Sequence, residues 1–536
     1  MSAALVDYLR RRFACSEEVL AAADRLSAAW DRGHTAVEVG PLEAAALTAS
    51  PAVASSPQGE PRPLVLENGL LQSWRHSQAE LELAQALRTR AASGASAPGS
   101  AVEAAFAKLF PDPGDPQAVA VRLGLDRGLA LITGGPGTGK THTAARLLGL
   151  LLEGEPRLNF ALAAPTGKAA QRLGESMARA AASPEVRAAL PAGAAALAAA
   201  PNRAATLHRL LEWNPAHDFC GRDARRPLEL DLLLVDEAGM LDLLMWTALL
   251  RALPGACRLV VLGDPFQLES IAPGRVLGEL VAAGDSGVLK GCRAELKRNY
   301  RFDAHPGIGA LAQAVRARDA GAALEAAPVG APEGAEVVRL EGDGAVAGLL
   351  DRVWGGVLRL ARARESGEAQ AALEGLRLLC ALNEGPWGVE GINARIFARL
   401  EREGLGGGAW PVLVRANDAH SGLFNGDLGV MLPFPEGPRA VFFGGNAPRS
   451  FVPAQLPDHG PAWAMTVHRS QGSEYATVAL VLPPEPLEWV GPELLYTAVT
   501  RAREKVVLAA SAEVLRAACT AQPPRGTALG RRLGSS

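Results

Sequence analysis

The sequence predicts an α/β protein with two parallel-sheet domains of the P-loop type, a helical N-terminal domain and a small β-barrel inserted into the second sheet domain. Two observations predict the sheets. Short apolar segments recur along the chain, and each is followed by a loop and then by a helical pattern. Polar residues stand where each apolar segment ends, as expected for parallel sheets whose ligands bind beyond the carboxyl ends of the strands.

Length and charge set the first limits on function. A chain of 536 residues is too long for one compact core, and roughly three or four domains are expected. The formal net charge of −3 argues against a protein that holds nucleic acid mainly through a bulk positive field. If the chain binds DNA or RNA, it needs a local channel, helix dipoles with neutral polar groups, or a basic partner.

The cysteines and the apolar runs indicate a cytoplasmic protein. The six cysteines are scattered singly, without a C-x-x-C pair or zinc-like Cys/His spacing, which favours free thiols over a metal ribbon or a disulfide framework. The N-terminus is charged within ten residues and lacks the long apolar region of a signal peptide. No apolar run approaches the length of about 20 residues that crosses a bilayer, so no membrane association is expected.

Residues 1–110 are expected to form a separate helical domain. The apolar residues between Leu64 and Leu87, for example, recur with helical spacing. A linker-like stretch, RAASGASAPGS, lies near the end of this region at residues 90–100. Because the region carries no chemical motif, we expect it to serve docking rather than catalysis.

The first sheet domain is expected at residues 115–290. Its predicted strands are Leu129–Thr133, Phe160–Ala164, Leu230–Val235 and Arg258–Leu262. An Ala-rich interval at about 175–228, poor in strand signals, is expected to be a small inserted subdomain.

The second sheet domain is expected at residues 291–400 and 460–525. Its predicted strands are Leu376–Ala381, Ala462–Val467, Ala476–Leu482 and Lys505–Ala509. Between the first and second of these, short strands are separated by Gly, Asn and Asp, which predicts the β-barrel insertion at 401–459. The barrel strands are expected at Pro411–Ala416, Gly429–Pro433 and Ala440–Phe443.

One Gly-rich turn predicts a nucleoside triphosphate site. Residues 134–141 read GGPGTGKT and fit the P-loop pattern G-x-x-x-x-G-K-[ST]. In such a loop backbone N–H groups cradle phosphate oxygens, Lys140 places its charge on the β and γ phosphates, and Thr141 offers a hydroxyl ligand to Mg²⁺. A chance Gly-rich turn is disfavoured because a strand precedes it and a helix follows. The nucleotide-binding residues are therefore Gly134, Gly135, Pro136, Gly137, Thr138, Gly139, Lys140 and Thr141.

Three polar side chains at later strand ends predict hydrolysis of the nucleotide. Asp236 is expected to hold Mg²⁺, and Glu237 to take a proton from the attacking water. Gln267 follows the next strand, where a neutral amide can sense the γ phosphate and orient water. Solvated strand-end acids and a polar loop residue are the alternatives, but an acidic pair about 95 residues after a P-loop favours catalysis.

Two arginines in the second domain are candidates for stabilising the transition state. Arg301 lies in LKRNYRF and Arg501 in LLYTAVTRAREK. Guanidinium groups that reach the γ phosphate from outside the P-loop domain stabilise the charge it gains during transfer. Each arginine taken alone is more often part of a surface ion pair.

The order of these blocks resembles superfamily 1 helicases, and within them the RecD type, the α subunit of the RecBCD exonuclease (exodeoxyribonuclease V). The general blocks are APTGKAAQRL (164–173), TLHRLL (206–211), VDEAGM (235–240), GDPFQLESIAPG (263–274), LKRNYRF (296–302), TVHRSQGSE (466–474) and YTAVTRARE (496–504). The blocks that resemble the RecD type are CALNEGPWGVEGIN (380–393) and LFNGDLGVMLP (423–433).

The resemblance implies two RecA-like domains, an SH3-like barrel and further site residues. Gln117 is implied to read the adenine, and Gly472 and Glu474 to lie near the ribose. The implied contacts to single-stranded DNA are Pro165, Thr166, Thr206, His208, Thr466, His468 and Ser470. The two histidines have ordinary buried or capping roles as their alternative.

The resemblance further implies an ATP- and Mg²⁺-dependent DNA helicase that moves 5′ to 3′ on single-stranded DNA from duplex ends. It would act with RecB- and RecC-like subunits in a heterotrimer that processes double-strand breaks for recombinational repair. Nuclease activity is expected in a partner subunit, because we find no additional acidic metal cluster in the sequence.

The sequence departs from the family pattern at three positions. Gly239 stands where a serine is usual, Phe266 where an acidic residue is frequent, and Arg469 where a lysine is frequent. None of the departures falls on a residue assigned to hydrolysis, so activity is expected to be intact.

Three other functions fit part of the sequence. A stand-alone RecD-like helicase carries a longer N-terminal region with helix-hairpin-helix repeats, whereas only about 110 residues precede Gln117 here, without such a repeat. A non-motor scaffold with a relic nucleotide site is disfavoured by the complete hydrolysis set. An RNA helicase fits the general blocks but not those of the RecD type.

Overall fold

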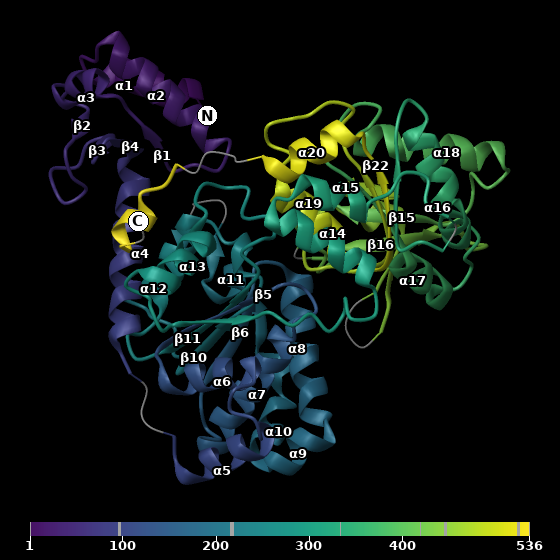
Figure 1. The fold of residues 1–536 in the computed structure, drawn as a ribbon, viewed down its shortest axis with the longest axis horizontal. Coiled ribbons are helices and arrows are strands. Elements are labelled where there is room, and N and C mark those ends of the chain that lie inside the picture. The colour runs from purple at the N-terminus through teal and green to yellow at the C-terminus, as the bar shows by residue number, and fades with distance from the viewer. Residues whose placement is uncertain are drawn as a thin grey trace. The chain divides into compact units, whose positions relative to one another are not determined.

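A computed structural model describes residues 2–94, 98–214, 219–332, 334–418, 420–443, 447–521 and 526–534. The chain divides into two compact units. Unit 1 comprises residues 1–265, 269–298 and 524–536, and unit 2 comprises residues 266–268 and 299–523. The chain therefore passes between the units four times, and a three-residue segment near residue 267 belongs to the second unit. Figure 1 labels the elements of both units.

Unit 1 is built around a six-stranded parallel sheet. Its strand order is β12-β5-β11-β10-β6-β7, and each neighbouring pair runs parallel. The strands are β5 (Leu129–Gly134), β6 (Phe160–Ala164), β7 (Ala204–Thr206), β10 (Leu232–Val235), β11 (Arg258–Gly263) and β12 (Arg293–Leu296). All four strands predicted for this domain are confirmed, whereas β7 and β12 were not predicted.

Both faces of this sheet are buried, which explains why its strands read as continuous apolar runs. Alternate residues of β5 enter different cores: Ala130 and Ile132 pack on one face, and Leu129 and Leu131 on the other. The first face is covered by α6 (Pro116–Asp126), α7 (Lys140–Gly154) and α8 (Gly167–Ala182). The second face is covered by α4 (Trp74–Ala92), α12 (Leu243–Ala252) and α13 (Val276–Ser286).

The interval predicted as an inserted subdomain is mostly helical where the structure describes it. After α8 come α9 (Pro184–Ala189), α10 (Pro191–Leu197) and a 3₁₀ turn at Ala200–Arg203. Leu190 and Leu197 are fully buried in the same core as α7. The chain then forms β7 at the sheet edge, α11 (Leu207–Leu210) and the two-stranded ribbon β8 (Trp213–Asn214) and β9 (Phe219–Cys220).

The N-terminal region contains the predicted helices but also a small sheet. Its helices are α1 (Ser2–Arg12), α2 (Glu17–Trp30), α3 (Pro41–Thr48), α4 and α5 (Ser100–Leu109). Four short strands form a sheet in the order β1-β4-β3-β2: β1 (Ala36–Glu38), β2 (Val53–Ala54), β3 (Leu64–Glu67) and β4 (Leu70–Ser73). A purely helical description of residues 1–110 is therefore incomplete.

The helical prediction is wrong for residues 64–73, which form the hairpin β3–β4. Asn68 and Gly69 form its turn with φ of 52° and 75°. Asn-Gly is the favoured pair for a two-residue turn with positive φ at both positions. The helix α4 begins only at Trp74, where the Ser73 side chain accepts a hydrogen bond from the His76 backbone.

The last described residues, 526–534, pack against the N-terminal region of unit 1 (Figure 1). The Gly526 carbonyl accepts hydrogen bonds from the backbone N–H groups of Thr35 and Ala36, at 2.8 and 2.9 Å. Leu529 and Leu533 are buried in the core beneath α4 and α13. Because residues 299–523 lie between, this pairing joins the two ends of the chain within one unit.

Unit 2 contains a five-stranded parallel sheet in the order β13-β22-β21-β14-β20. Its strands are β13 (Val337–Leu340), β14 (Leu376–Cys380), β20 (Ala464–Thr466), β21 (Tyr475–Val481) and β22 (Ala502–Ala509). The four predicted strands are confirmed, and β13 adds an edge. One face packs on α14 (Pro306–Ala317), α15 (Ala320–Ala326), α19 (Pro492–Val499) and α20 (Ala512–Thr520). The other face packs on α16 (Ala345–Ala361), α17 (Ser366–Gly375) and α18 (Val389–Arg402).

The predicted insertion forms an antiparallel sheet rather than part of the parallel one. Its order is β18-β17-β16-β15-β19, comprising β15 (Trp410–Val414), β16 (Leu428–Leu432), β17 (Arg439–Phe442), β18 (Arg449–Phe451) and β19 (His459–Pro461). Val412, Met431 and Phe442 belong to a small core on one side of this sheet. Three of its strands were predicted, and β18 and β19 were not.

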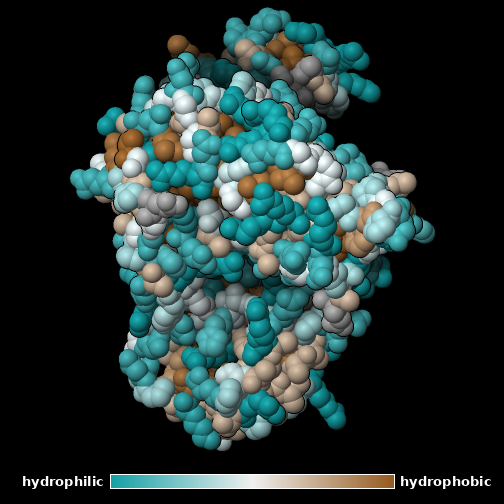
Figure 2. Space-filling view, turned by 90° about the vertical axis from the view of Figure 1, so that its right-hand side faces the viewer, coloured by the Kyte–Doolittle hydropathy of each residue, from teal (hydrophilic) through white to brown (hydrophobic). Residues whose placement is uncertain are grey.

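Hydrophilic residues predominate on the face shown in Figure 2, where the hydrophobic residues lie in small separate groups. Within the described ranges, no helix combines the length and apolarity needed to cross a membrane.

Candidate nucleotide and DNA site

The P-loop joins the end of β5 to the start of α7, as its sequence predicts. Gly137 and Gly139 have φ of 79° and 85°, a left-handed conformation that glycine adopts without strain. At Gly134 a Cβ atom would lie 2.6 Å from Thr138 Oγ1 and 2.7 Å from the Leu296 carbonyl. The loop therefore depends on glycine for its conformation and for its close packing against β12.

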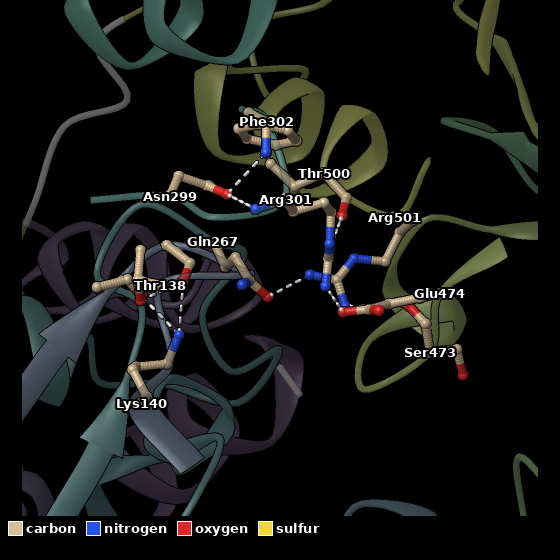
Figure 3. A network of polar contacts seen from close by, with 12 residues as sticks. Thr138, Lys140, Gln267, Asn299, Arg301, Phe302, Ser473, Glu474, Thr500 and Arg501 are labelled. Atoms are coloured by element: carbon tan, nitrogen blue, oxygen red, sulfur yellow. Dashed lines mark hydrogen bonds and ion pairs between the residues drawn. The ribbon is translucent and has the colours of Figure 1, made fainter. Parts of the chain in front are cut away.

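Lys140 is the first residue of α7, and its side chain folds back over the loop (Figure 3). Its Nζ donates to the Gly134 carbonyl at 2.6 Å and to the Gly135 carbonyl at 2.9 Å. The Thr138 hydroxyl also donates to the Gly135 carbonyl, at 2.8 Å. The ammonium group thus lies over a helix N-terminus whose N–H groups attract anions. Thr141 follows on the first turn of α7 and is half-buried.

Asp236 and Glu237 follow β10, two strands from the P-loop strand in the sheet order. Desolvation and the neighbouring Glu237 carboxylate raise the pKa of Asp236 to about 6, while the charge of Lys140 acts in the opposite direction. Lys140 is therefore near enough to Asp236 for its charge to favour the ionised carboxylate. Glu237 has φ of 52° and ψ of 40°, an uncommon conformation for a residue other than glycine.

Gln117 lies at the start of α6, which packs against α7 in the core of unit 1. Asp115 caps this helix by accepting a hydrogen bond from the Gln117 backbone N–H at 2.7 Å. The Gln117 side chain is largely buried. The helix cap therefore fixes the position of Gln117 relative to the helix that carries Lys140.

The predicted DNA contacts of unit 1 lie at the carboxyl ends of two neighbouring strands. Ala164 of β6 pairs with Thr206 of β7, and Pro165 and Thr166 follow directly after β6. The Thr166 and Thr206 hydroxyls each accept a backbone N–H at the start of a helix, α8 and α11, both at 3.2 Å. A hydroxyl that accepts in this way keeps its proton for donation to another group.

His208 lies on α11 with its ring edge against the Trp213 indole, at a centroid distance of 5.9 Å. Desolvation lowers its pKa, so the imidazole is mainly neutral at pH 7.

In unit 2, Arg501 is buried, with 2% of its surface exposed. It donates to three acceptors: Gln267 Oε1 at 2.9 Å, the Ser473 carbonyl at 3.2 Å and the Thr497 carbonyl at 3.2 Å (Figure 3). All three acceptors are neutral. Among the residues that the structure describes, no carboxylate forms an ion pair with this guanidinium, so its charge is not compensated locally.

Arg301 differs from Arg501 because a carboxylate compensates its charge. Its Nη2 donates to Glu474 Oε1 at 2.5 Å, and its Nη1 donates to the Thr500 carbonyl at 3.3 Å. The structure thus brings Gln267, Arg301, Glu474 and Arg501 into one polar network within unit 2 (Figure 3). Neither arginine is an isolated surface residue.

The remaining predicted residues follow β20, which ends at Thr466. His468 begins a 3₁₀ turn that ends at Ser470, and desolvation lowers its pKa. Ser470 is fully buried, and its hydroxyl donates to the Val467 carbonyl at 2.6 Å. In this structure Ser470 therefore stabilises the turn instead of facing solvent. Gly472 has φ of 67° and turns the chain toward Glu474.

Two of the three departures from the family pattern, Gly239 and Arg469, fit their surroundings in the structure. A Cβ atom on Gly239 would lie 3.5 Å from the Leu277 side chain, an ordinary contact distance, so packing does not require glycine there. Arg469 is exposed, and desolvation and the nearby Arg415 lower its pKa.

The sequence reasoning missed the residues that hold the segment Phe266–Leu268. The Leu268 backbone N–H donates to Thr497 Oγ1, and Gln471 Nε2 donates to the Leu268 carbonyl, both at 2.7 Å. Thr497 and Gln471 lie inside two of the sequence blocks that resemble the helicases. Leu268 lies more than 200 positions before them in the sequence, so the local pattern does not predict these contacts.

Two family models and several known proteins match this chain. A model of the AAA domain matches residues 117–273, and a model of the UvrD-like helicase C-terminal domain matches residues 461–509. The chain is 41% identical to the RecBCD enzyme subunit RecD of Mycolicibacterium smegmatis over 81% of its own length and 78% of the relative. It is 31% identical to the ATP-dependent RecD2 DNA helicase of Deinococcus radiodurans over 76% of its length and 50% of that protein. Among solved structures, the Pif1 helicase from Candida albicans matches with a TM-score of 0.40 and 16% identity, over 74% of this chain and 94% of that one.

Proposed function

Because the chain belongs to the RecD family of superfamily 1 DNA helicases, we propose that it works as the RecD subunit of a helicase–nuclease of the RecBCD type. The chain is an ATP-driven DNA helicase. It is 41% identical to a RecD subunit but 31% identical to the RecD2 helicase. That difference favours the subunit over a stand-alone enzyme.

One observation supports the mechanism: Lys140 at the P-loop and the pair Asp236–Glu237 after β10 stand at the carboxyl edge of one parallel sheet. The loop N–H groups and Lys140 bind the β and γ phosphates of ATP, and Gln117 contacts the adenine. Thr141 and Asp236 would hold Mg²⁺, and the bound ion would supply positive charge to the phosphate oxygens. Glu237 accepts the proton of the attacking water.

The arginine network of unit 2 supplies positive charge to the γ phosphate. Arg501 is suited to this role because it is buried with neutral acceptors only, so an anion gains the full attraction of its charge. Arg301 has to leave Glu474 before it binds phosphate. Glu474 is then available to the ribose, together with Gly472. Gln267 orients the water once Arg501 no longer holds its amide oxygen.

Single-stranded DNA binds along the strand ends of both parallel sheets. Pro165, Thr166, Thr206 and His208 contact it from unit 1, and Thr466 and His468 contact it from unit 2. Ser470 joins this set when its turn rearranges and releases the hydroxyl. Alternate tightening of the two contact sets during the ATP cycle moves the protein 5′ to 3′ from a duplex end.

The other parts of the chain serve assembly. Residues 1–110 dock on RecB- and RecC-like subunits in the cytoplasm, and nuclease chemistry lies in one of those partners. The first RecA-like domain comprises residues 115–290. The second comprises residues 291–400 and 460–525. The SH3-like barrel is formed by the five-stranded antiparallel sheet of residues 401–459 and its flanks. The element that separates the two DNA strands lies in residues 175–228.

The test measures ATP hydrolysis by the purified chain with and without single-stranded DNA, beside Lys140→Ala. We expect DNA to stimulate hydrolysis and Lys140→Ala to abolish it. A rate that DNA does not change, or that survives Lys140→Ala, contradicts the motor. DNA degradation by the chain alone in Mg²⁺ that persists in Lys140→Ala contradicts the placement of the nuclease in a partner.

Co-purification with RecB- and RecC-like subunits tests the docking role. A chain lacking residues 1–30, a deletion that removes α1 and α2 and leaves α4 in place on the sheet, should lose the partners. The Lys140→Ala variant should keep them as the matched control. Retention of both partners by the truncated chain contradicts the assignment.

A further inference from the structure

Arg377 is a buried cation in the parallel sheet of unit 2, and the proposed mechanism does not use it. It lies on β14, an interior strand, and 1% of its surface is exposed. Its Nη1 donates to the Ala462 carbonyl at 2.6 Å, and its Nη2 donates to the Leu373 carbonyl at 3.2 Å. Within the described ranges, no carboxylate forms an ion pair with it. An apolar side chain would fill the same space without the cost of burying a charge.

The fold stabilises this charge with carbonyl dipoles and an aromatic ring. Leu373 lies in the last turn of α17, so Nη2 stands at the negative end of that helix dipole. The Arg377 guanidinium carbon lies 5.0 Å from the centroid of the Tyr475 ring. Desolvation lowers the pKa of Arg377, and a side-chain hydrogen bond to Tyr475 acts in the opposite direction. Arg377 therefore holds the side chain of Tyr475, the first residue of β21.

Tyr475 and the two residues before it, together segment 473–475, hold both arginines of the polar network. The Ser473 carbonyl accepts from Arg501 at 3.2 Å, and the Tyr475 backbone N–H donates to the Arg501 carbonyl at 2.9 Å. Glu474 Oε1 accepts from Arg301 at 2.5 Å. Each residue of the segment thus contacts one of the two arginines.

Segment 473–475 lies at an irregular end of its strand. Gly472, just before it, has φ of 67°, and the register of β21 against β22 shifts between Tyr475 and Thr477. A displacement of Tyr475 would move groups that hold both arginines. The contact with Arg377 ties this irregular end to β14, the neighbouring strand on the other side of β21.

We propose that Arg377 is a positioning residue that acts through Tyr475 and holds segment 473–475 where Arg501 and Arg301 can act on the γ phosphate. This inference rests on the proposed function, in which the arginine network supplies charge to that phosphate. Arg377 needs no contact with the nucleotide in this role. Its loss lowers the rate of hydrolysis rather than the affinity for ATP, because the P-loop and adenine contacts belong to unit 1.

The test is the steady-state kinetics of DNA-stimulated ATP hydrolysis by the full chain. We expect Arg377→Met to lower kcat roughly tenfold and to change KM for ATP less than about twofold, because small displacements of charge-stabilising groups mainly affect the transition state.

Arg339→Met is the matched control. Arg339 is also buried in the unit 2 sheet and also donates to backbone carbonyls, but it lies on the edge strand β13 and pairs with Glu341. Its replacement should lower the melting temperature, as Arg377→Met does, and should leave kcat within about twofold of wild type.

A second variant keeps the core packed. Tyr475→Phe retains the ring and removes the hydroxyl that bonds to Arg377, so kcat should fall about threefold while the circular dichroism spectrum stays that of the wild type. The effects of Arg377→Met and Tyr475→Phe should not add in the double variant, because both remove the same contact.

Three results overturn the proposal while leaving the motor intact. The first is kcat within about twofold of wild type in Arg377→Met. The second is an equal loss of kcat in Arg377→Met and Arg339→Met, which marks a general effect of unfolding. The third is a loss in Arg377→Met that lies in KM alone. Hydrolysis that survives Lys140→Ala, or that is unchanged in Arg501→Ala, defeats the proposed function instead, so the two failures are distinct.

Discussion

At the residue scale, the proposed role of Asp236 in binding Mg²⁺ depends on its pKa. A carboxyl with an ordinary pKa near 4 stays charged down to low pH, whereas desolvation and Glu237 raise the pKa of Asp236 to about 6. The protonated form cannot serve as a Mg²⁺ ligand. Metal binding therefore competes with protonation within the range of a normal assay.

We expect Mg²⁺-dependent nucleotide binding to weaken as pH falls from 7 to 5, by about tenfold per pH unit below 6. Titration of Mg²⁺ against a fluorescent nucleotide measures this affinity. Asp236→Asn should bind Mg²⁺ more weakly at pH 7 and should lose the part of the pH dependence that comes from protonation of Asp236. The pH dependence that remains in the variant measures protonation of the nucleotide itself. Equal pH dependence in both proteins would count against the assignment.

Glu237 combines a catalytic assignment with an unfavourable backbone conformation. Its φ of 52° costs an L-residue roughly 1–2 kcal/mol relative to the right-handed helical region. The strain is located at the residue that we propose accepts the proton, and such strain is common at functional sites.

Glu237→Gln and Glu237→Gly should both bind nucleotide and both lose hydrolysis. Glu237→Gly should be the more stable by about 1 kcal/mol, because glycine adopts this φ without strain. Urea unfolding monitored by circular dichroism compares the two. A glycine variant less stable than the glutamine variant would contradict the strain.

At the element scale, the C-terminal segment 526–534 is a structural part of unit 1. Thr527 Oγ1 donates to the Glu80 carboxylate at 2.9 Å, and Thr35 Oγ1 and Gln72 Nε2 donate to it as well, at 2.6 and 3.0 Å. Burial raises the pKa of Glu80, and these hydrogen bonds and Arg532 act in the opposite direction. The segment therefore supplies one of the three hydrogen-bond donors to the fully buried Glu80 carboxylate.

Removal of residues 526–536 should expose the backbone of β1 and the buried face of α4, and hydrogen exchange should show loss of protection there. Leu533→Ala should destabilise unit 1 by about 3 kcal/mol, because a fully buried leucine leaves a cavity. Arg516→Ala, at an exposed position on α20, is the control for thermal unfolding. Unchanged protection of β1 and α4 in the truncated chain would contradict this structural role.

At the scale of the whole molecule, the small negative charge of −3 agrees with a DNA path made of neutral groups. The assigned contacts are hydroxyls, a proline and two histidines whose pKa is lowered by desolvation. Because neutral groups do not neutralise phosphate charges, few counterions are released from the DNA when these groups bind it. Binding should therefore depend only weakly on ionic strength.

We expect a slope of log K against log salt no steeper than about −3 for an oligothymidine, against about −7 for a protein that neutralises about ten single-strand phosphates. Fluorescence anisotropy between about 50 and 300 mM salt measures it. Thr166→Ala should weaken binding without changing the slope, because it removes no charge. A slope near −6 would show that basic residues outside the assigned set dominate.

The sequence by itself determined the features that depend on local chemistry. Glycines with the spacing of residues 134–141 fix the P-loop because its turn needs positive φ at Gly137 and Gly139. Apolar runs fixed eight strands of the two parallel sheets, since both faces of such strands are buried. At residues 64–73 the local pattern is ambiguous, because the Asn68–Gly69 pair is typical of a hairpin turn whereas the spacing of the leucines around it is typical of a helix.

Only the tertiary structure decided which distant residues become partners. Arg301 pairs with Glu474 at a separation of 173 positions, and Arg501 pairs with Gln267 at a separation of 234. Nothing in the local pattern distinguishes an arginine with a carboxylate partner from one with neutral acceptors. The assignment of Phe266–Leu268 to unit 2 and the return of residues 526–534 to unit 1 have the same origin. Such contacts arise when whole elements pack together, and periodicity encodes which face of an element is buried but not which surface covers it.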